Sequence, residues 1–131
     1  MTAFVDASVL VAVLARESDY LEQNDRMLSH DHLLWSAISR WEAIGGVARA
    51  TTYGDALSAK VVDAFAEENG FEMIMIGEAE ARLATEAHHR YGKGRHEAKH
   101  NMGDCFAYAC ARTNNATLLY KGDDFARTDL R

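Results

Sequence analysis

Short apolar runs alternate with longer amphipathic stretches along most of the chain. A short apolar run bounded by polar residues is typical of a buried strand, whereas apolar residues three or four positions apart are typical of a helix. Because the two patterns alternate, we expect an α/β fold with a central, mostly parallel sheet flanked by helices. The predicted strands span residues 2–6, 32–35, 71–76 and 117–120. The predicted helices span residues 8–16, 18–29, 36–49, 55–69, 78–91 and 102–113.

Local signals refine the boundaries and surroundings of these elements. Ser8 and Ser36 are typical helix N-caps, and Ser8 favours a helix over an extension of the first strand. Met73 and Met75 belong to the third predicted strand, where we expect them in the core. Residues 92–100 are polar and basic and contain glycine, which predicts a loop. The chain ends soon after the fourth strand, so we expect four or five short strands, with little room for a last edge strand.

The composition is that of one soluble globular domain, which we expect to cover residues 1–131. The chain is 48% hydrophobic and 26% charged, and its 131 residues can bury a core without disulfides. Cys105 and Cys110 lie five positions apart on different faces of a predicted helix, so we expect reduced thiols and a cytoplasmic protein. No apolar run reaches the ~20 residues that cross a membrane, and the N-terminus lacks the basic start of a signal peptide.

Four acids occupy positions from which they can meet. Asp6 ends the first predicted strand, and Asp124 follows the fourth. Asp104 lies in the first turn of the helix before that strand, and Glu42 lies inside the helix after the second. Any one of them alone would more often be a turn or cap residue. Ligands bind at the carboxyl ends of the strands in an open parallel sheet, so we expect the four to converge there.

Converging carboxylates need a cation. They repel one another and raise each other's pKa values, and the sequence offers them no obvious basic partners at matching depth. Magnesium prefers oxygen ligands and relieves this repulsion. A bound metal ion also polarises a phosphoryl oxygen and activates water. The pattern therefore predicts a Mg²⁺ site, with Mn²⁺ as a substitute, held chiefly by Asp6 and Asp104 and supported by Glu42 and Asp124.

The formal net charge of −6 at pH 7 bears on nucleic-acid binding, because an acidic protein does not attract nucleic acid through its overall field. Binding of RNA would then need local basic residues or bound cations. Residues 88–100 form a dense basic stretch that we expect to contact RNA phosphates, with Tyr91 stacking on a base. A solvated surface loop is the alternative for this stretch. The candidate phosphate contacts are Arg90, Lys93, Arg95, Lys99, Lys121 and Arg127.

Four segments spread along nearly the whole chain match the motifs of a known family in the family's order. They read FVDASVLVAVL, SAISRWEA, YGKGRHEAKHNMGDCFAYACA and LLYKGDDFARTDL. On these segments the chain resembles the PIN-domain ribonucleases, specifically the VapC-type toxins of toxin–antitoxin pairs. The resemblance implies that Asp6, Glu42, Asp104 and Asp124 are the family's four successive acids. It also implies Mg²⁺- or Mn²⁺-dependent hydrolysis of RNA to 5′-phosphate and 3′-hydroxyl ends, a VapB-type antitoxin partner and a homodimer.

The chain departs from the family pattern in two places. The position after the first acid is commonly Thr in the family and is Ala7 here, although Ser8 still supplies a hydroxyl beside Asp6. The fourth acid is ambiguous, because Asp123 precedes Asp124 directly. Asp124, which stands immediately before a phenylalanine, is the better match, with Asp123 as the fallback and Asp129 as a weaker third option.

Three other interpretations fit parts of the sequence. A zinc site would use His96 and His100, four positions apart, with His88 or His89, but no cysteine lies nearby. A phosphotransferase with Asp6 as nucleophile usually needs a second acid two positions later, where this chain has a serine. A catalytically degenerate module that only binds RNA or an antitoxin remains the main alternative, and the presence of all four acids argues against it. We therefore expect an endoribonuclease toxin.

Overall fold

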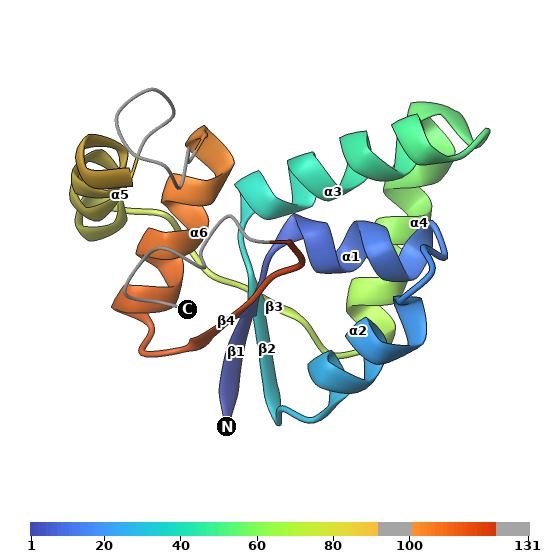
Figure 1. Ribbon diagram of the computed structural model, residues 1–131, viewed down its shortest axis with the longest axis horizontal. Helices are drawn as coiled ribbons and strands as arrows, with labels where there is room; N and C mark the ends of the chain where they lie inside the picture. Colours follow the sequence, from blue (N-terminus) through green and yellow to red (C-terminus); the bar gives the residue numbers. More distant parts are fainter. Residues whose placement is uncertain (92–100, 123–131) are drawn as a thin grey trace.

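The computed structural model describes residues 1–91 and 101–122, and its centre is a four-stranded parallel sheet (Figure 1). The strand order is β3-β2-β1-β4, and all three neighbouring pairs are parallel. This confirms the α/β architecture predicted from the alternating pattern. The strands are β1 (Thr2–Val5), β2 (His32–Trp35), β3 (Glu72–Met73) and β4 (Thr117–Leu119).

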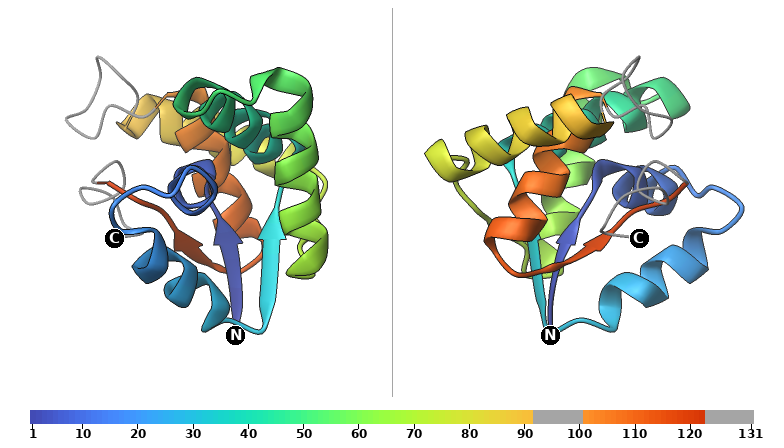
Figure 2. Two further views of the ribbon diagram at one scale, coloured as in Figure 1. Left: turned by 90° about the vertical axis from the view of Figure 1, so that its right-hand side faces the viewer. Right: turned by 60° about the vertical axis from the view of Figure 1, so that its left-hand side comes forward.

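In the described residues, six helices lie on the two faces of this sheet, and Figure 2 shows the two layers from other sides. Helices α5 and α6 pack on one face, and α1 to α4 pack on the other. Each helix lies within two residues of the range predicted from the sequence. The helices are α1 (Ala7–Leu14), α2 (Tyr20–Leu28), α3 (Ala37–Ala50), α4 (Gly54–Glu68), α5 (Glu78–Tyr91) and α6 (Met102–Thr113).

Strand β1 is buried from both sides, which explains its continuous apolar sequence. Side chains alternate across a strand, so Phe4 enters the core under α5 and α6 while Ala3 and Val5 enter the core under α1 to α4. All three are fully buried. The strand therefore ends in the middle of the molecule, and this fixes the position of the residue that follows it, Asp6.

The third strand is much shorter than predicted. The sequence predicts residues 71–76, whereas β3 has two residues and lies at an edge of the sheet. Ile74 and Ile76 pack against the core under α5 and α6, but Met75 is 89% exposed and Met73 is also exposed. The prediction that the two methionines belong to the core is wrong, because one face of this edge segment has no covering layer within the described residues.

Two further expectations concern the thiols and membrane insertion. Cys105 and Cys110 are free, as predicted, and the structure also buries both of them. Burial raises the pKa of Cys105 to about 11 and that of Cys110 to about 12, so both thiols stay protonated and unreactive at neutral pH. Across residues 1–91 and 101–122, none of the helices has the length and apolar character needed to cross a membrane.

Candidate active site

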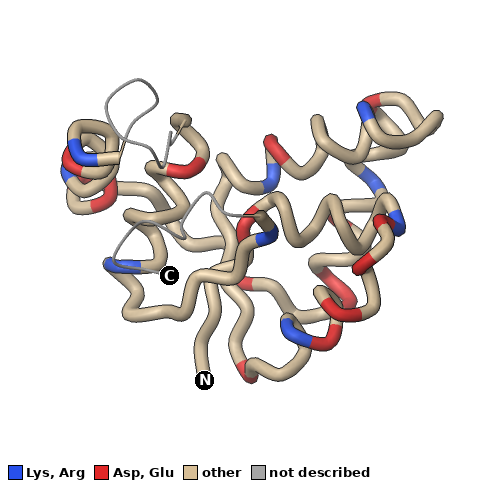
Figure 3. The backbone as a smooth tube through the Cα atoms, viewed as in Figure 1, with Lys and Arg blue, Asp and Glu red and all other residues tan. Residues whose placement is uncertain are grey.

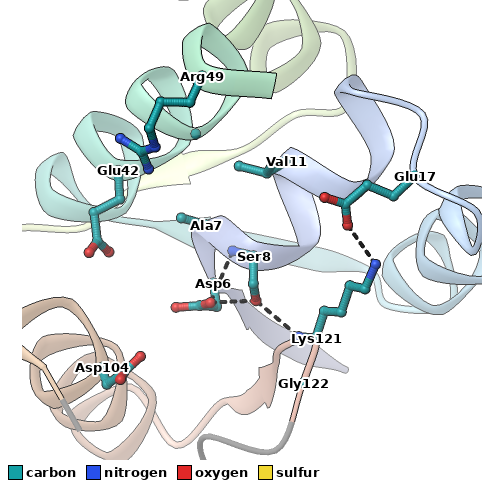
Figure 4. A pocket seen from close by; sticks show the side chains of 11 residues that line it. Asp6, Ala7, Ser8, Val11, Glu17, Glu42, Arg49, Asp104, Lys121 and Gly122 are labelled. Carbon is teal, nitrogen blue, oxygen red and sulfur yellow. Dashed lines mark hydrogen bonds and ion pairs between the residues drawn. The ribbon is translucent and has the colours of Figure 1, made fainter. Parts of the chain in front are cut away.

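Three of the four predicted acids line one pocket of about 420 Å³ at the carboxyl ends of β1 and β4 (Figure 4). Asp6 follows β1 directly, Glu42 lies on α3, and Asp104 lies in the first turn of α6. The three come from segments far apart in the sequence. They meet because parallel strands end at the same edge of the sheet and the helices that follow them start there.

Asp6 is held by contacts to both neighbouring elements. It caps α1, since its Oδ2 accepts hydrogen bonds from the Ser8 amide at 3.0 Å and the Ser8 hydroxyl at 2.5 Å. Its own amide donates to the Leu119 carbonyl at the end of β4 at 2.9 Å. The Ser8 hydroxyl in turn accepts from the Lys121 amide at 2.9 Å. The N-cap of α1 is therefore Asp6, not Ser8 as predicted, and Ser8 links Asp6 to the chain after β4.

Asp104 is oriented by the start of α6. Its amide donates to Oδ1 of Asn101 at 2.9 Å, and its Oδ2 accepts from the Asn101 amide at 3.1 Å, which together form a reciprocal capping box. The carboxylate also lies where the helix dipole favours negative charge. Asp104 is buried all the same. The helix start thus stabilises a buried carboxylate and turns it towards the pocket (Figure 4).

Glu42 approaches the backbone of α6 very closely. A Cβ atom added to Gly103 would overlap the Glu42 carboxyl group, so a larger residue there would force the Glu42 side chain to shift. Burial and the negative charge of Asp6 raise the pKa of Glu42, and the positive charge of Arg49 lowers it. The effect of Asp6 on Glu42 agrees with the predicted repulsion between converging acids.

The donor set fits a hard divalent cation. The three acids offer only carboxylate oxygens to the pocket, and the ionised form of Glu42 is disfavoured by burial and by the charge of Asp6. Within residues 1–91 and 101–122, no three His, Cys, Asp or Glu side chains are grouped closely enough to hold an ion as they stand. This still agrees with Mg²⁺, which commonly uses one or two protein carboxylates and completes its shell with waters and substrate phosphates.

Lys121, a predicted phosphate contact, also lines the pocket but has carboxylate partners. Its Nζ lies 2.5 Å from Oε1 of Glu17 and 2.8 Å from Oδ1 of Asp19. These hydrogen bonds raise the pKa of Lys121 and lower that of Asp19. The network ties the segment between α1 and α2 to the end of β4. A phosphate at Lys121 would have to compete with two carboxylates.

The remaining predicted RNA contacts lie mainly outside the described part of the chain. Arg90, at the end of α5, stacks its guanidinium 4.9 Å from the ring centroid of Tyr91. Tyr91 itself is buried and packs against Tyr108, so the prediction that it stacks on a base is wrong. Figure 3 shows the described lysines and arginines scattered over several helices. The predicted residues outside the described ranges are Lys93, Arg95, His96, Lys99, His100, Asp123, Asp124, Arg127 and Asp129.

Sequence reasoning missed two charged residues of the pocket, Arg49 and Glu17. Arg49 follows Glu42 by seven positions, two helical turns, so a helical projection would have placed both on one face of α3. Glu17 lies between two helices, and nothing in its local sequence indicates that it reaches the pocket.

Comparison with known proteins identifies the family of the chain. The PIN domain model matches residues 3–130 of the chain. A VapC ribonuclease of Rhizobium meliloti (strain 1021) is 37% identical over 140 residues, covering 98% of this chain and 99% of that protein. Ribonuclease VapC30 of Mycobacterium tuberculosis is 32% identical over 126 residues, covering 96% and 94%.

A solved structure shows the same fold. The crystal structure of Mycobacterium tuberculosis VapC20, described as a sarcin-ricin loop cleaving toxin, superposes with a TM-score of 0.78 over 98% of this chain and 96% of that one. The two sequences are only 15% identical, so this likeness concerns the fold alone. Membership of a family is shown instead by the family model and by the two relatives that are more than 30% identical. The chain therefore belongs to the PIN-domain family, within the group of VapC-type ribonucleases.

Proposed function

We propose that this chain is a Mg²⁺-dependent endoribonuclease and the toxin of a type II toxin–antitoxin pair, acting in the cytoplasm. The observation that carries the proposal is the convergence of Asp6, Glu42 and Asp104 in one pocket. The VapC ribonucleases that match nearly the full chain support the same activity. The reaction is hydrolysis of an RNA phosphodiester bond by in-line attack of water.

The side chains of the site have separate tasks in this proposal. Asp6 and Asp104 are the chief ligands of Mg²⁺ or Mn²⁺, and Glu42 supports them together with Asp124, for which Asp123 is the fallback. When bound, the ion would activate water and neutralise charge on the phosphate. Ser8 holds the Asp6 carboxylate and the Asn101 amide holds that of Asp104, so both ligands are oriented before substrate arrives.

Removal of the metal tests the proposal and its main alternative. Purified protein treated with EDTA is expected to cleave cellular RNA at least about 10³-fold more slowly, because a catalytic metal contributes several kcal/mol to the barrier. Added Mg²⁺ or Mn²⁺ should restore cleavage, measured as the rate of fragment formation with the cut sites mapped. Undiminished cleavage in EDTA would exclude a metal mechanism. Binding of RNA without cleavage under any of these ions would instead support a catalytically degenerate module.

The proposed partners are RNA, a second copy of the chain and a small VapB-type antitoxin. For RNA we propose phosphate contacts from Arg90, Lys93, Arg95 and Lys99, with Lys121 at the pocket. When co-expressed with the product of a small reading frame directly upstream, the protein is expected to co-purify with it and to lose RNA cleavage. Light scattering should give the mass of two chains for the free protein. A monomer, or activity unaffected by the bound upstream product, would contradict the corresponding partner.

A further inference from the structure

The two described cations of the pocket, Arg49 and Lys121, are in different states. The ammonium of Lys121 contacts the carboxylates of Glu17 and Asp19. Arg49 has neither a hydrogen bond nor an ion pair to another side chain of the described ranges, and it is exposed to solvent. Its guanidinium influences Glu42 only through their charges. Arg49 therefore keeps its donors available for a ligand.

The helix positions this guanidinium beside the acids. Arg49 and Glu42 are two turns apart on α3, and the Arg49 side chain points back towards Glu42 in Figure 4. Gly45 leaves space for it, since a Cβ atom added there would lie 3.2 Å from Nη1 of Arg49. The free donors thus line the pocket at its α3 side, near Glu42.

A guanidinium in this position suits a phosphodiester. Its planar fork of N–H donors matches two phosphate oxygens, and such charge-assisted pairs are among the stronger hydrogen bonds in proteins. The rest of the pocket is acidic, so it repels an RNA backbone until a cation neutralises it. We propose that Arg49 binds a backbone phosphate of the RNA at the α3 side of the active site. The inference rests on the proposed nuclease function and adds a substrate contact to it.

An RNA-binding measurement separates this role from others. In the otherwise native chain, affinity for a labelled, non-cleavable analogue of single-stranded RNA is measured with Mg²⁺ over a range of salt concentrations. Arg49→Ala is expected to weaken binding roughly 10-fold, as for loss of a charged hydrogen bond, and to reduce the log–log salt slope by about 0.7, the contribution of one phosphate. Arg49→Lys should keep the slope but recover only part of the affinity, because an ammonium cannot bind in a fork.

Arg40→Ala is the matched control. Arg40 lies on the same helix but outside the pocket, where it forms two hydrogen bonds of 2.8 Å with Asp63. Arg40→Ala removes the same positive charge from α3 but leaves the pocket unchanged. RNA affinity and salt slope should therefore stay at the native values. If Arg40→Ala weakens binding as much as Arg49→Ala, the effect comes from overall charge and the proposed phosphate contact is wrong.

Cleavage kinetics give a second readout. Arg49→Ala in the otherwise native chain should raise KM roughly 10-fold with little change in kcat, because a contact to a phosphate that does not react is made in both ground and transition states. Unchanged affinity, slope and KM in a folded Arg49→Ala protein would overturn the inference while leaving the nuclease proposal intact. The inference would also be overturned if Arg49→Ala changed only the affinity for the metal, because Arg49 would then act as a charge partner of Glu42. If the native chain shows no metal-dependent cleavage, the nuclease proposal fails, and the salt slope still decides whether Arg49 binds phosphate.

Discussion

Replacing Asp104 with asparagine is expected to lower metal-dependent RNA cleavage by at least about 10³-fold and to leave the fold intact. The amide oxygen at position 104 can still accept the hydrogen bond from the Asn101 amide, so the capping box that starts α6 survives. A neutral amide cannot supply the negative charge that holds a divalent ion, and the metal contributes several kcal/mol to catalysis. Cleavage rates with Mg²⁺ and thermal unfolding by circular dichroism measure the two effects separately.

Asp55→Asn is the control for this substitution. Asp55 is also an acid in the first turn of a helix, α4, but it is exposed and lies outside the pocket. The Asp55→Asn variant should therefore cleave RNA at the native rate. A folded Asp104→Asn protein that retains activity within a few-fold of native would remove Asp104 from the proposed metal site, and an equal loss in both variants would point to net charge as the cause.

Gly46→Ala should destabilise the protein by about 2 kcal/mol, as expected for overpacking in a well-packed core. A Cβ atom at this position would overlap Cγ2 of Val11, a residue of α1. Valine is stiff at χ1 and cannot turn aside easily, so α1 and α3 would have to move apart. Both helices line the pocket, and the same substitution should therefore also impair cleavage. Urea unfolding followed by circular dichroism measures the loss of stability.

The neighbouring substitution Gly45→Ala, by contrast, should not lower the free energy of unfolding. A Cβ atom at Gly45 meets only the far end of the flexible Arg49 side chain, at 3.2 Å. Alanine also favours the helix interior over glycine by roughly 0.5–1 kcal/mol. The free energy of unfolding should therefore stay the same or rise slightly. If both glycine substitutions shift stability in the same direction and by the same amount, helix propensity and not the α1–α3 contact explains the result.

The alternation of apolar runs and amphipathic stretches was enough to predict the fold class, because parallel strands buried on both faces have a recognisable sequence. Ala3, Phe4 and Val5 show this directly, since each one enters a core. The same pattern misled the prediction for residues 71–76. An apolar run does not reveal whether both of its faces will be covered, and at the edge of this sheet Met73 and Met75 stay exposed.

The acids of the site were predictable for a similar reason. The rule that ligands bind at the carboxyl ends of parallel strands needs only the order of the elements. It predicted that Asp6, Glu42 and Asp104 would converge, and all three line one pocket. The fine structure of the site was not predictable. That Asp6 and not Ser8 caps α1, and that Gly103 leaves room for Glu42, depends on contacts between segments that are distant in sequence.

The order of elements and the positions of the acids within it were determined by the sequence alone, through local periodicity and chain punctuation. Only the tertiary structure decided which cations and rings of the chain are available to a substrate. It pairs Lys121 with Glu17 and Asp19, buries Tyr91 against α6, and leaves Arg49 without a carboxylate bonded to it among the described residues. The physical reason is that side-chain availability depends on which surfaces packing brings together, and local sequence patterns carry no information about partners a hundred residues away.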